Sequence, residues 1–252
     1  MTLVISKEQI ALAPKVLLHD HLDGGLRPQT MIDHALASGY TKLPSYEPEQ
    51  LAKWFVEACS SGTLELYLET FEHTISVMQT TEEIIRVARE CVLDLAADNV
   101  VYAEVRGAPE LFTRKGLTMD QVIEATVEGF NQGMAEVAHN GKKIRVEHIL
   151  CALRQNHVSD EVATKVVKYK GRGVVGFDIA GPEAGFPPTD HIKAFNYLRD
   201  SGAHYTIHAG EAFGVESIAL AVNECGAQRI GHGIRLIDDI DFSSGEAKLG
   251  SL

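Results

Sequence analysis

Length, composition and charge limit the classes of protein to which this chain can belong. Its 252 residues suffice for one large domain or two small ones with a sizeable core. A composition of 45% hydrophobic and 23% charged residues is typical of a globular fold and excludes a disordered chain or a fibre. The formal net charge of −12 argues against nucleic acid as the main partner, because no basic cluster can neutralise phosphates. A free nucleoside remains a possible small-molecule ligand.

Cysteine usage and the N-terminal segment indicate a cytoplasmic protein. Cys59, Cys91, Cys151 and Cys225 lie far apart, so the sequence has neither a CxxC metal motif nor a dense disulfide framework. The first twenty residues contain acidic Glu8 and only short apolar runs, which do not resemble a signal peptide or a membrane span. We therefore expect a reducing compartment and no membrane partner.

Short aliphatic runs, each followed by a helical pattern, predict alternating strands and helices. The predicted strands span residues 15–18, 100–105, 144–150, 174–179, 204–207 and 229–230. From the second strand on, their spacing fits one strand plus one crossover helix, which is typical of a parallel sheet.

The interval between the first two strands is too long for a single crossover and predicts a helical insertion. Its expected helices span residues 29–38, 48–60 and 64–99, the last broken near Thr80-Thr81, where Thr81-Glu-Glu predicts an N-cap. Such an insertion could cover a pocket. No repeat, low-complexity tract or linker appears, so we predict one domain over residues 1–252.

Polar residues follow every predicted strand, and this distribution favours a barrel. They are His19, His21, Glu104, Arg106, His148, Asp178, His208, Glu211 and His232. Groups from six successive strands converge on the mouth of a (β/α) barrel, whereas an open sheet gathers its ligands at one switch point. We predict an α/β fold, a TIM-type (β/α) barrel that is incomplete, with about six of its eight strands.

The two histidines after the first strand have the spacing of metal ligands. His19 and His21 are two residues apart, so on a strand both rings project from the same face. Chance alone supplies about half of one such pair in this composition, so the pair by itself equally fits ordinary packing. A second strand end adds His208-Ala-Gly-Glu211, and a third places His232 between two glycines. Three motifs of matching chemistry favour a metal site.

Read together, four motifs resemble the adenosine deaminase family of zinc-dependent amidohydrolases, which are TIM-barrel enzymes. In chain order they are LLHDHLDGG, VVGFDIAGPE, YTIHAGE and RIGHGIR, and the resemblance runs from about Leu17 to the end of the chain. The resemblance implies one zinc ion per chain, with His19, His21 and His208 as its histidine ligands.

The resemblance also implies roles around the metal. Glu211 corresponds to the carboxylate that shuttles protons, and His232 to the residue that orients and helps to activate the attacking water. Asp23 corresponds to the ligand of the ribose 5′-hydroxyl and Gly181 to the backbone donor to purine N3, while His21 also lies against the nucleoside. In addition, Leu51 and Trp54 resemble an apolar lid over the base.

The chemistry of these residues fits hydrolytic deamination of adenosine and 2′-deoxyadenosine to inosine and ammonia, a reaction of purine nucleoside salvage. Zinc held by neutral imidazoles lowers the pKa of water to about 7, and Glu211 can protonate the ring nitrogen N1. The H-x-E and P-C-x-x-C motifs of another zinc deaminase fold do not occur. Two alternatives are a zinc amidohydrolase acting on a different aminopurine and an inactive fragment that only binds metal.

The sequence departs from the family pattern at its C-terminal end. Members continue through two more strands to an Asp-Asp pair, one of whose carboxylates binds the zinc, and this chain as given ends before that position. Asp238-Asp239 is interpreted instead as the solvated first turn of a helix after the sixth strand. We expect a chain that lacks the pair to have little activity. The remaining histidines His34, His73, His139, His157 and His191 are predicted to be packing or surface residues.

Overall fold

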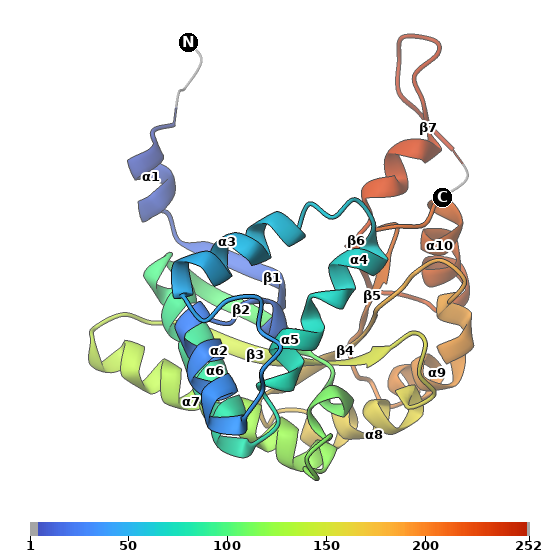
Figure 1. Ribbon diagram of the computed structural model, residues 1–252. Coiled ribbons are helices and arrows are strands. Elements are labelled where there is room, and N and C mark those ends of the chain that lie inside the picture. The colour runs from blue at the N-terminus through green and yellow to red at the C-terminus, as the bar shows by residue number, and fades with distance from the viewer. Residues whose placement is uncertain (1–4, 251–252) are drawn as a thin grey trace. The chain divides into compact units, whose positions relative to one another are not determined.

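The computed structural model describes residues 5–250, in which strands and helices alternate along the chain (Figure 1). The chain forms two compact units. Unit 1 contains the described part of Met1–Trp54 together with Phe71–Gly107 and Leu111–His148. Unit 2 contains Phe55–Thr70, Ala108–Glu110 and the described residues from Ile149 onwards. That the chain forms one domain stays a prediction.

Parallel strands form the sheet of unit 1. Strand β1 (Lys15–His21) pairs in parallel with β2 (Val100–Gly107), from Lys15 opposite Val100 to His21 opposite Arg106. The other neighbour of β2 is β3 (Arg145–Leu153), whose first residues belong to this unit. The first three predicted strands are therefore confirmed, and each extends past its predicted C-terminal end by two or three residues.

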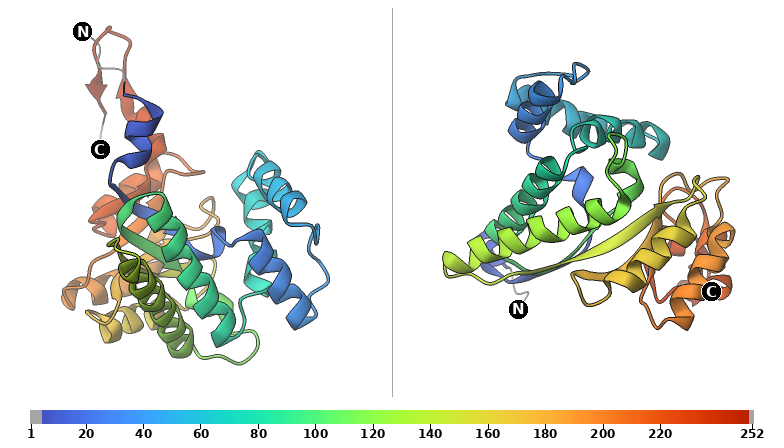
Figure 2. Two further views of the ribbon diagram at one scale, coloured as in Figure 1. Left: turned by 90° about the vertical axis from the view of Figure 1, so that its left-hand side faces the viewer. Right: turned by 90° about the horizontal axis from the view of Figure 1, so that it is seen from below.

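Two long helices cover this sheet and run side by side, as Figure 2 shows. Helices α6 (Thr81–Ala97) and α7 (Met119–His139) approach closely because α7 carries glycine at the contact. A Cβ atom on Gly129 would lie 2.5 Å from the carbonyl oxygen of Ile85. The buried core beneath them is aliphatic, with Phe130 at its centre and 1% exposed.

The predicted helical insertion is present, although its boundaries differ from those predicted. It contains α2 (Pro28–Ser38), α3 (Pro48–Ala58), α4 (Leu64–Glu69) and α5 (Phe71–Ser76), and the short α1 (Lys7–Leu12) precedes β1. The sequence pattern did not reveal the break between α4 and α5.

The N-cap of α6 lies one residue earlier than predicted. The hydroxyl of Thr80 accepts a hydrogen bond from the Glu83 backbone N–H at 3.3 Å, and the Glu83 carboxylate accepts one from the Thr80 N–H at 2.9 Å. This reciprocal pair is a capping box, which requires a carboxylate three residues after the cap. Thr81 is therefore the first residue of the helix.

Unit 2 contains the end of β3 and three further parallel strands. These are β4 (Val174–Ala180), β5 (Thr206–Ala209) and β6 (Arg229–His232). Strand β5 pairs in parallel with β6, and a bridge between Phe177 and Tyr205 connects β4 to the start of β5. The last three predicted strands are thus confirmed.

Helices α8 (Ser159–Tyr169), α9 (Ile192–Asp200) and α10 (Val215–Ala219) complete unit 2. Phe195 of α9 packs against Phe177 and Tyr205, with ring centroids 5.8 and 5.2 Å away. Short helical turns η2 (Pro109–Phe112), η3 (Pro188–His191) and η4 (Leu220–Glu224) lie between the larger elements. Within residues 5–250, no helix is both long and apolar enough to cross a membrane.

The segment after β6 differs from the helix predicted there. The helical turn η5 (Ile234–Asp239) is followed by a short antiparallel ribbon of β7 (Ile240–Asp241) and β8 (Lys248–Leu249). A turn forms between the two strands because the Asp241 carboxylate accepts a hydrogen bond from the Ser243 backbone N–H at 2.7 Å. Asp238-Asp239 therefore ends η5 rather than starting a helix, and Asp238 pairs with Arg235 at 2.7 Å.

Candidate active site

The end of β1 presents two histidine rings. His19 and His21 are both half-buried, and their ring centroids lie 5.4 Å apart, as expected for alternate residues of a strand. Beside them, Arg106 of β2 is 1% exposed and donates a hydrogen bond from Nη2 to the carbonyl oxygen of Leu18 at 2.6 Å. This bond helps to fix the backbone that carries the two rings.

Asp23 lies directly after β1, in the helical turn η1 (Leu22–Gly24). It is only 5% exposed, and this burial raises the pKa of its carboxyl to about 6. The negative charge of Asp20 contributes to the same upward shift of that pKa. A buried carboxyl with a shifted pKa at a strand end is typical of a ligand-binding group.

Gly181 follows β4 with a backbone that favours glycine. Its φ of +99° lies in the left-handed region, and a Cβ atom there would lie 2.7 Å from Oε1 of Gln155. A side chain at this position would therefore clash with Gln155. The backbone amide of Gly181 remains the predicted contact with the purine.

His208 of β5 is held by two buried side chains of unit 2. Its Nδ1 atom lies 3.0 Å from Oδ2 of Asp178 on β4, which is 0% exposed. A carboxylate at this distance favours the tautomer with the proton on Nδ1, which leaves Nε2 as the nitrogen that can donate its lone pair to a metal. The guanidinium of Arg154 donates to the carbonyl oxygen of His208.

Glu211 and His232 lie beside His208 in the same unit. The Oε2 atom of Glu211 is 3.5 Å from Nε2 of His232, and the His232 ring centroid is 5.1 Å from that of His208. Burial raises the pKa of the Glu211 carboxyl above its usual value. His232 has a φ of +67°, a left-handed conformation that is strained for a residue other than glycine and that often marks a functional position.

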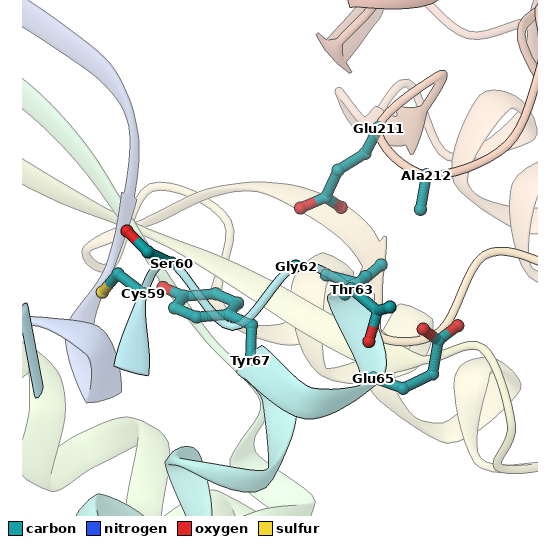
Figure 3. A pocket seen from close by; sticks show the side chains of 9 residues that line it. Cys59, Ser60, Gly62, Thr63, Glu65, Tyr67, Glu211 and Ala212 are labelled. Atoms are coloured by element: carbon teal, nitrogen blue, oxygen red, sulfur yellow. The ribbon is translucent and has the colours of Figure 1, made fainter. Parts of the chain in front are cut away.

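A pocket of about 650 Å³ opens in front of Glu211 within unit 2. Figure 3 shows the Glu211 carboxylate pointing into it, toward the segment that carries Thr63 and Tyr67. The pocket is lined by Cys59, Ser60, Gly62, Thr63, Leu64, Glu65, Tyr67, Glu211 and Ala212. Polar side chains and one aromatic ring therefore surround a carboxylate with a raised pKa.

Comparison with known proteins identifies the family of this chain. Residues 14–249 match the family model described as adenosine deaminase. A curated relative, the adenosine deaminase of Mycobacteroides abscessus, is 53% identical over 253 residues, which cover all of this chain and 70% of that protein. The chain belongs to the adenosine deaminase family. It spans 70% of the length of this relative and 63% of that of adenosine deaminase 1 of Streptomyces coelicolor, which is 54% identical.

Solved structures agree with membership of this family. An Arabidopsis protein named ADAL, complexed with IMP, is 26% identical with a TM-score of 0.76, and the match covers 89% of this chain and 66% of that one. An amidohydrolase from Burkholderia ambifaria with bound Zn is 24% identical, also with a TM-score of 0.76, over 94% of this chain and 64% of that one. The fold is thus that of the deaminase (β/α) barrels, as predicted, with six parallel strands among the described residues.

The donor set of this adenosine deaminase family member fits a metal cofactor. In unit 1 His19 and His21, and in unit 2 His208, carry ring nitrogens, the donor that divalent transition metals prefer in proteins. The Asp178 contact on His208 is the carboxylate–histidine arrangement that commonly supports such ligands.

Sequence reasoning missed two residues of the site: Arg154 donates to the carbonyl oxygen of His208, and Glu183 accepts from the Gly210 backbone N–H. Glu183 lies in the quoted motif VVGFDIAGPE, where it received no role. It is 4% exposed, and although burial favours its neutral form, hydrogen bonds from Ser217 and from loop amides hold its pKa below the usual value. Its position in a motif next to Gly181 was the one signal available. Arg154 carried no signal in the sequence.

Three of the five histidines that were predicted to be packing or surface residues have polar partners. His34 contacts the carbonyl oxygen of Val77 through Nδ1 at 3.0 Å, and His191 contacts the hydroxyl of Ser159 at 2.9 Å. His73 lies 2.9 Å from the hydroxyl of Tyr40. These contacts fit the packing roles that were predicted, while His139 and His157 are exposed.

The two residues predicted to form a lid lie in α3 of unit 1. Leu51 is 0% exposed, and the ring of Trp54 packs edge-on against His73 at a centroid distance of 5.4 Å. Both side chains thus have packing roles within their own unit. Their part in covering a base stays a prediction.

Proposed function

We propose that this protein carries out the zinc-dependent hydrolytic deamination of adenosine and 2′-deoxyadenosine to inosine and ammonia, within purine nucleoside salvage. The observation that carries the proposal is the cluster of Glu211, His232 and His208 in unit 2, in which Glu211 also lines a pocket. Together with His19 and His21, His208 would hold one zinc ion per chain. The 53% identity to a curated adenosine deaminase supports this assignment.

The residues divide the chemistry between them. When bound, zinc supplies the Lewis acidity that lowers the pKa of a water molecule to about 7. His232 orients the attacking water through its ring nitrogen. Glu211 donates a proton to N1 of the purine as water adds to C6, and a proton then passes to the leaving amine, which departs as ammonia. The raised pKa of Glu211, caused by burial, favours the protonated form that can donate.

Substrate binding would use residues at two further strand ends. Asp23 accepts a hydrogen bond from the ribose 5′-hydroxyl, the Gly181 backbone N–H donates to purine N3, and His21 lies against the nucleoside. The IMP bound by the Arabidopsis relative supports a small purine as the ligand class. We also propose a cytoplasmic location, in keeping with the four free cysteines.

A second candidate function is deamination of a different aminopurine. The IMP complex of the Arabidopsis protein favours a 5′-phosphorylated substrate for that relative. In this chain, however, the predicted partner of the 5′ position is the carboxylate of Asp23, which would repel a phosphate. We therefore expect nucleosides to be preferred over nucleotides.

The experiment is a comparison of ammonia release from adenosine, 2′-deoxyadenosine, adenine and AMP by the zinc-loaded protein, in a chain that continues through the two further strands and the Asp-Asp pair of the family pattern. The same completed chain serves for every activity measurement described below. We expect turnover of the two nucleosides, with kcat/KM at least tenfold lower for adenine and AMP. Asp23→Ala should raise KM for adenosine, whereas Asp200→Ala, a change of an exposed residue in α9, should leave it unchanged. Faster turnover of adenine or AMP would refute the nucleoside assignment.

A further inference from the structure

The Glu183 carboxylate is surrounded by backbone amides from one loop. Its Oε1 accepts a hydrogen bond from the Gly210 N–H at 2.6 Å, and its Oε2 accepts bonds from the amides of Glu211, Ala212 and Phe213 at 3.0, 2.7 and 2.8 Å. Four consecutive amides thus converge on one buried side chain. Such a concave group of amides attracts negative charge, and hydrogen bonds to a buried carboxylate are stronger than those between neutral groups.

The same loop is tied to the strand end that carries His232. The Gly233 N–H donates to the carbonyl oxygen of Ala209 at 3.0 Å, and the Arg235 N–H donates to that of Gly210 at 3.3 Å. The carbonyl groups at the start of the loop are therefore held by the segment after β6, while its amides are held by Glu183. Gly210 allows this double attachment because its φ of +70° lies in the left-handed region.

We propose that Glu183 is a positioning residue that holds the loop of residues 210–213 and thereby aims the Glu211 carboxylate at the pocket. One of the four amides belongs to Glu211 itself, so a tilt of the loop directly displaces the Glu211 side chain. Its carboxylate lies 3.5 Å from His232, a separation that small loop movements would alter. The catalytic part of this inference rests on the proposed function, whereas the attachment of the loop does not.

The first test measures the loop without using activity. Glu183→Gln replaces one acceptor oxygen by an NH₂ group that faces amide donors, so backbone hydrogen exchange at residues 210–213 should accelerate by about 10- to 100-fold. Glu224→Gln makes the same chemical change at an exposed position of unit 2 and should leave these amides unaffected. Unchanged exchange in Glu183→Gln would overturn the proposal. If that variant fails to fold, Glu183→Asp, which keeps the charge on a shorter side chain, should show a smaller acceleration.

The second test asks whether Glu183 acts through Glu211. In the wild-type background, Glu183→Gln should lower kcat for adenosine by at least about tenfold while KM changes little, because ground-state contacts with the nucleoside lie elsewhere. In the Glu211→Gln background the same change should have almost no further effect. Equal losses in both backgrounds would show a general structural role and contradict the proposal. A protein that is inactive in both backgrounds would refute the proposed function, and the exchange rates would still decide whether Glu183 holds the loop.

Discussion

The contact between Asp178 and His208 allows a prediction for metal affinity. Asp178 is 0% exposed and the His208 side chain is 5% exposed, so water has little access to the 3.0 Å contact between them. Substituting Asp178 by Asn keeps the shape of the side chain but removes its charge. The Nδ1 proton of His208 is then held less strongly, and Nε2 becomes a weaker donor to zinc.

The expected magnitude follows from the 3.0 Å separation and the burial of both groups. Interactions of this kind with a buried charged group contribute about 1.5–3 kcal/mol, which corresponds to about a 10- to 100-fold change in an equilibrium constant. We therefore expect zinc to dissociate about tenfold more readily from Asp178→Asn and about 100-fold more readily from Asp178→Ala.

Zinc affinity can be measured by equilibrium competition with a chromophoric chelator, with circular dichroism to verify folding. Asp200→Asn, an exposed position of α9 in the same unit, is the matched control and should bind zinc as the wild type does. Folded Asp178→Asn and Asp178→Ala proteins with wild-type zinc affinity would refute the role given to this carboxylate.

Two further predictions concern unit 1. Burial lowers the pKa of His148 to about 4 in the folded protein, whereas the pKa of an unfolded histidine is about 6.5. Between these two pH values only the unfolded chain takes up the proton. The free energy of unfolding should therefore fall as the pH drops from about 6.5 to about 4. Urea unfolding across that range should show a smaller decline in His148→Gln, and identical declines would contradict the assignment. Gly129→Ala should lower the free energy of unfolding by about 1–3 kcal/mol, because the new methyl group overpacks against Ile85. The higher helix propensity of alanine offsets up to about 1 kcal/mol of this loss. Chemical denaturation measures the change, with exposed Gln132→Ala of α7 as the control, and a more stable Gly129→Ala would show that the two helices are not in close contact.

The sequence predicted the strands well because buried parallel strands consist of short aliphatic runs. It also predicted that polar residues would follow each strand, as Glu211 does after β5, although His208 lies within that strand. The position of the α6 cap was wrong by one residue, since Thr80 and Thr81 have the same chemistry and only Glu83 distinguishes them. Local patterns of this kind fix the type of an element better than its ends.

The residues that support the site could not be predicted in the same way. Asp178 contacts His208, and Glu183 contacts the loop of residues 210–213. Each pair is separated by about 30 residues of sequence, so no local pattern predicts the contact. The segment after β6 was predicted as a helix because the family pattern continues there. The hydrogen bond between Asp241 and Ser243 instead favours a turn and a short ribbon.

The central claim is that Glu211 transfers protons during hydrolytic deamination of adenosine. The most direct test compares ammonia release from adenosine by the wild-type protein and by Glu211→Gln, both in the chain completed with the Asp-Asp pair and both at equal, measured zinc content. The account predicts that the wild-type protein forms inosine and ammonia, and that Glu211→Gln keeps its zinc while kcat falls by about 10²- to 10⁴-fold. Near-normal turnover by zinc-loaded Glu211→Gln, or no ammonia from the zinc-loaded wild-type protein, would contradict it.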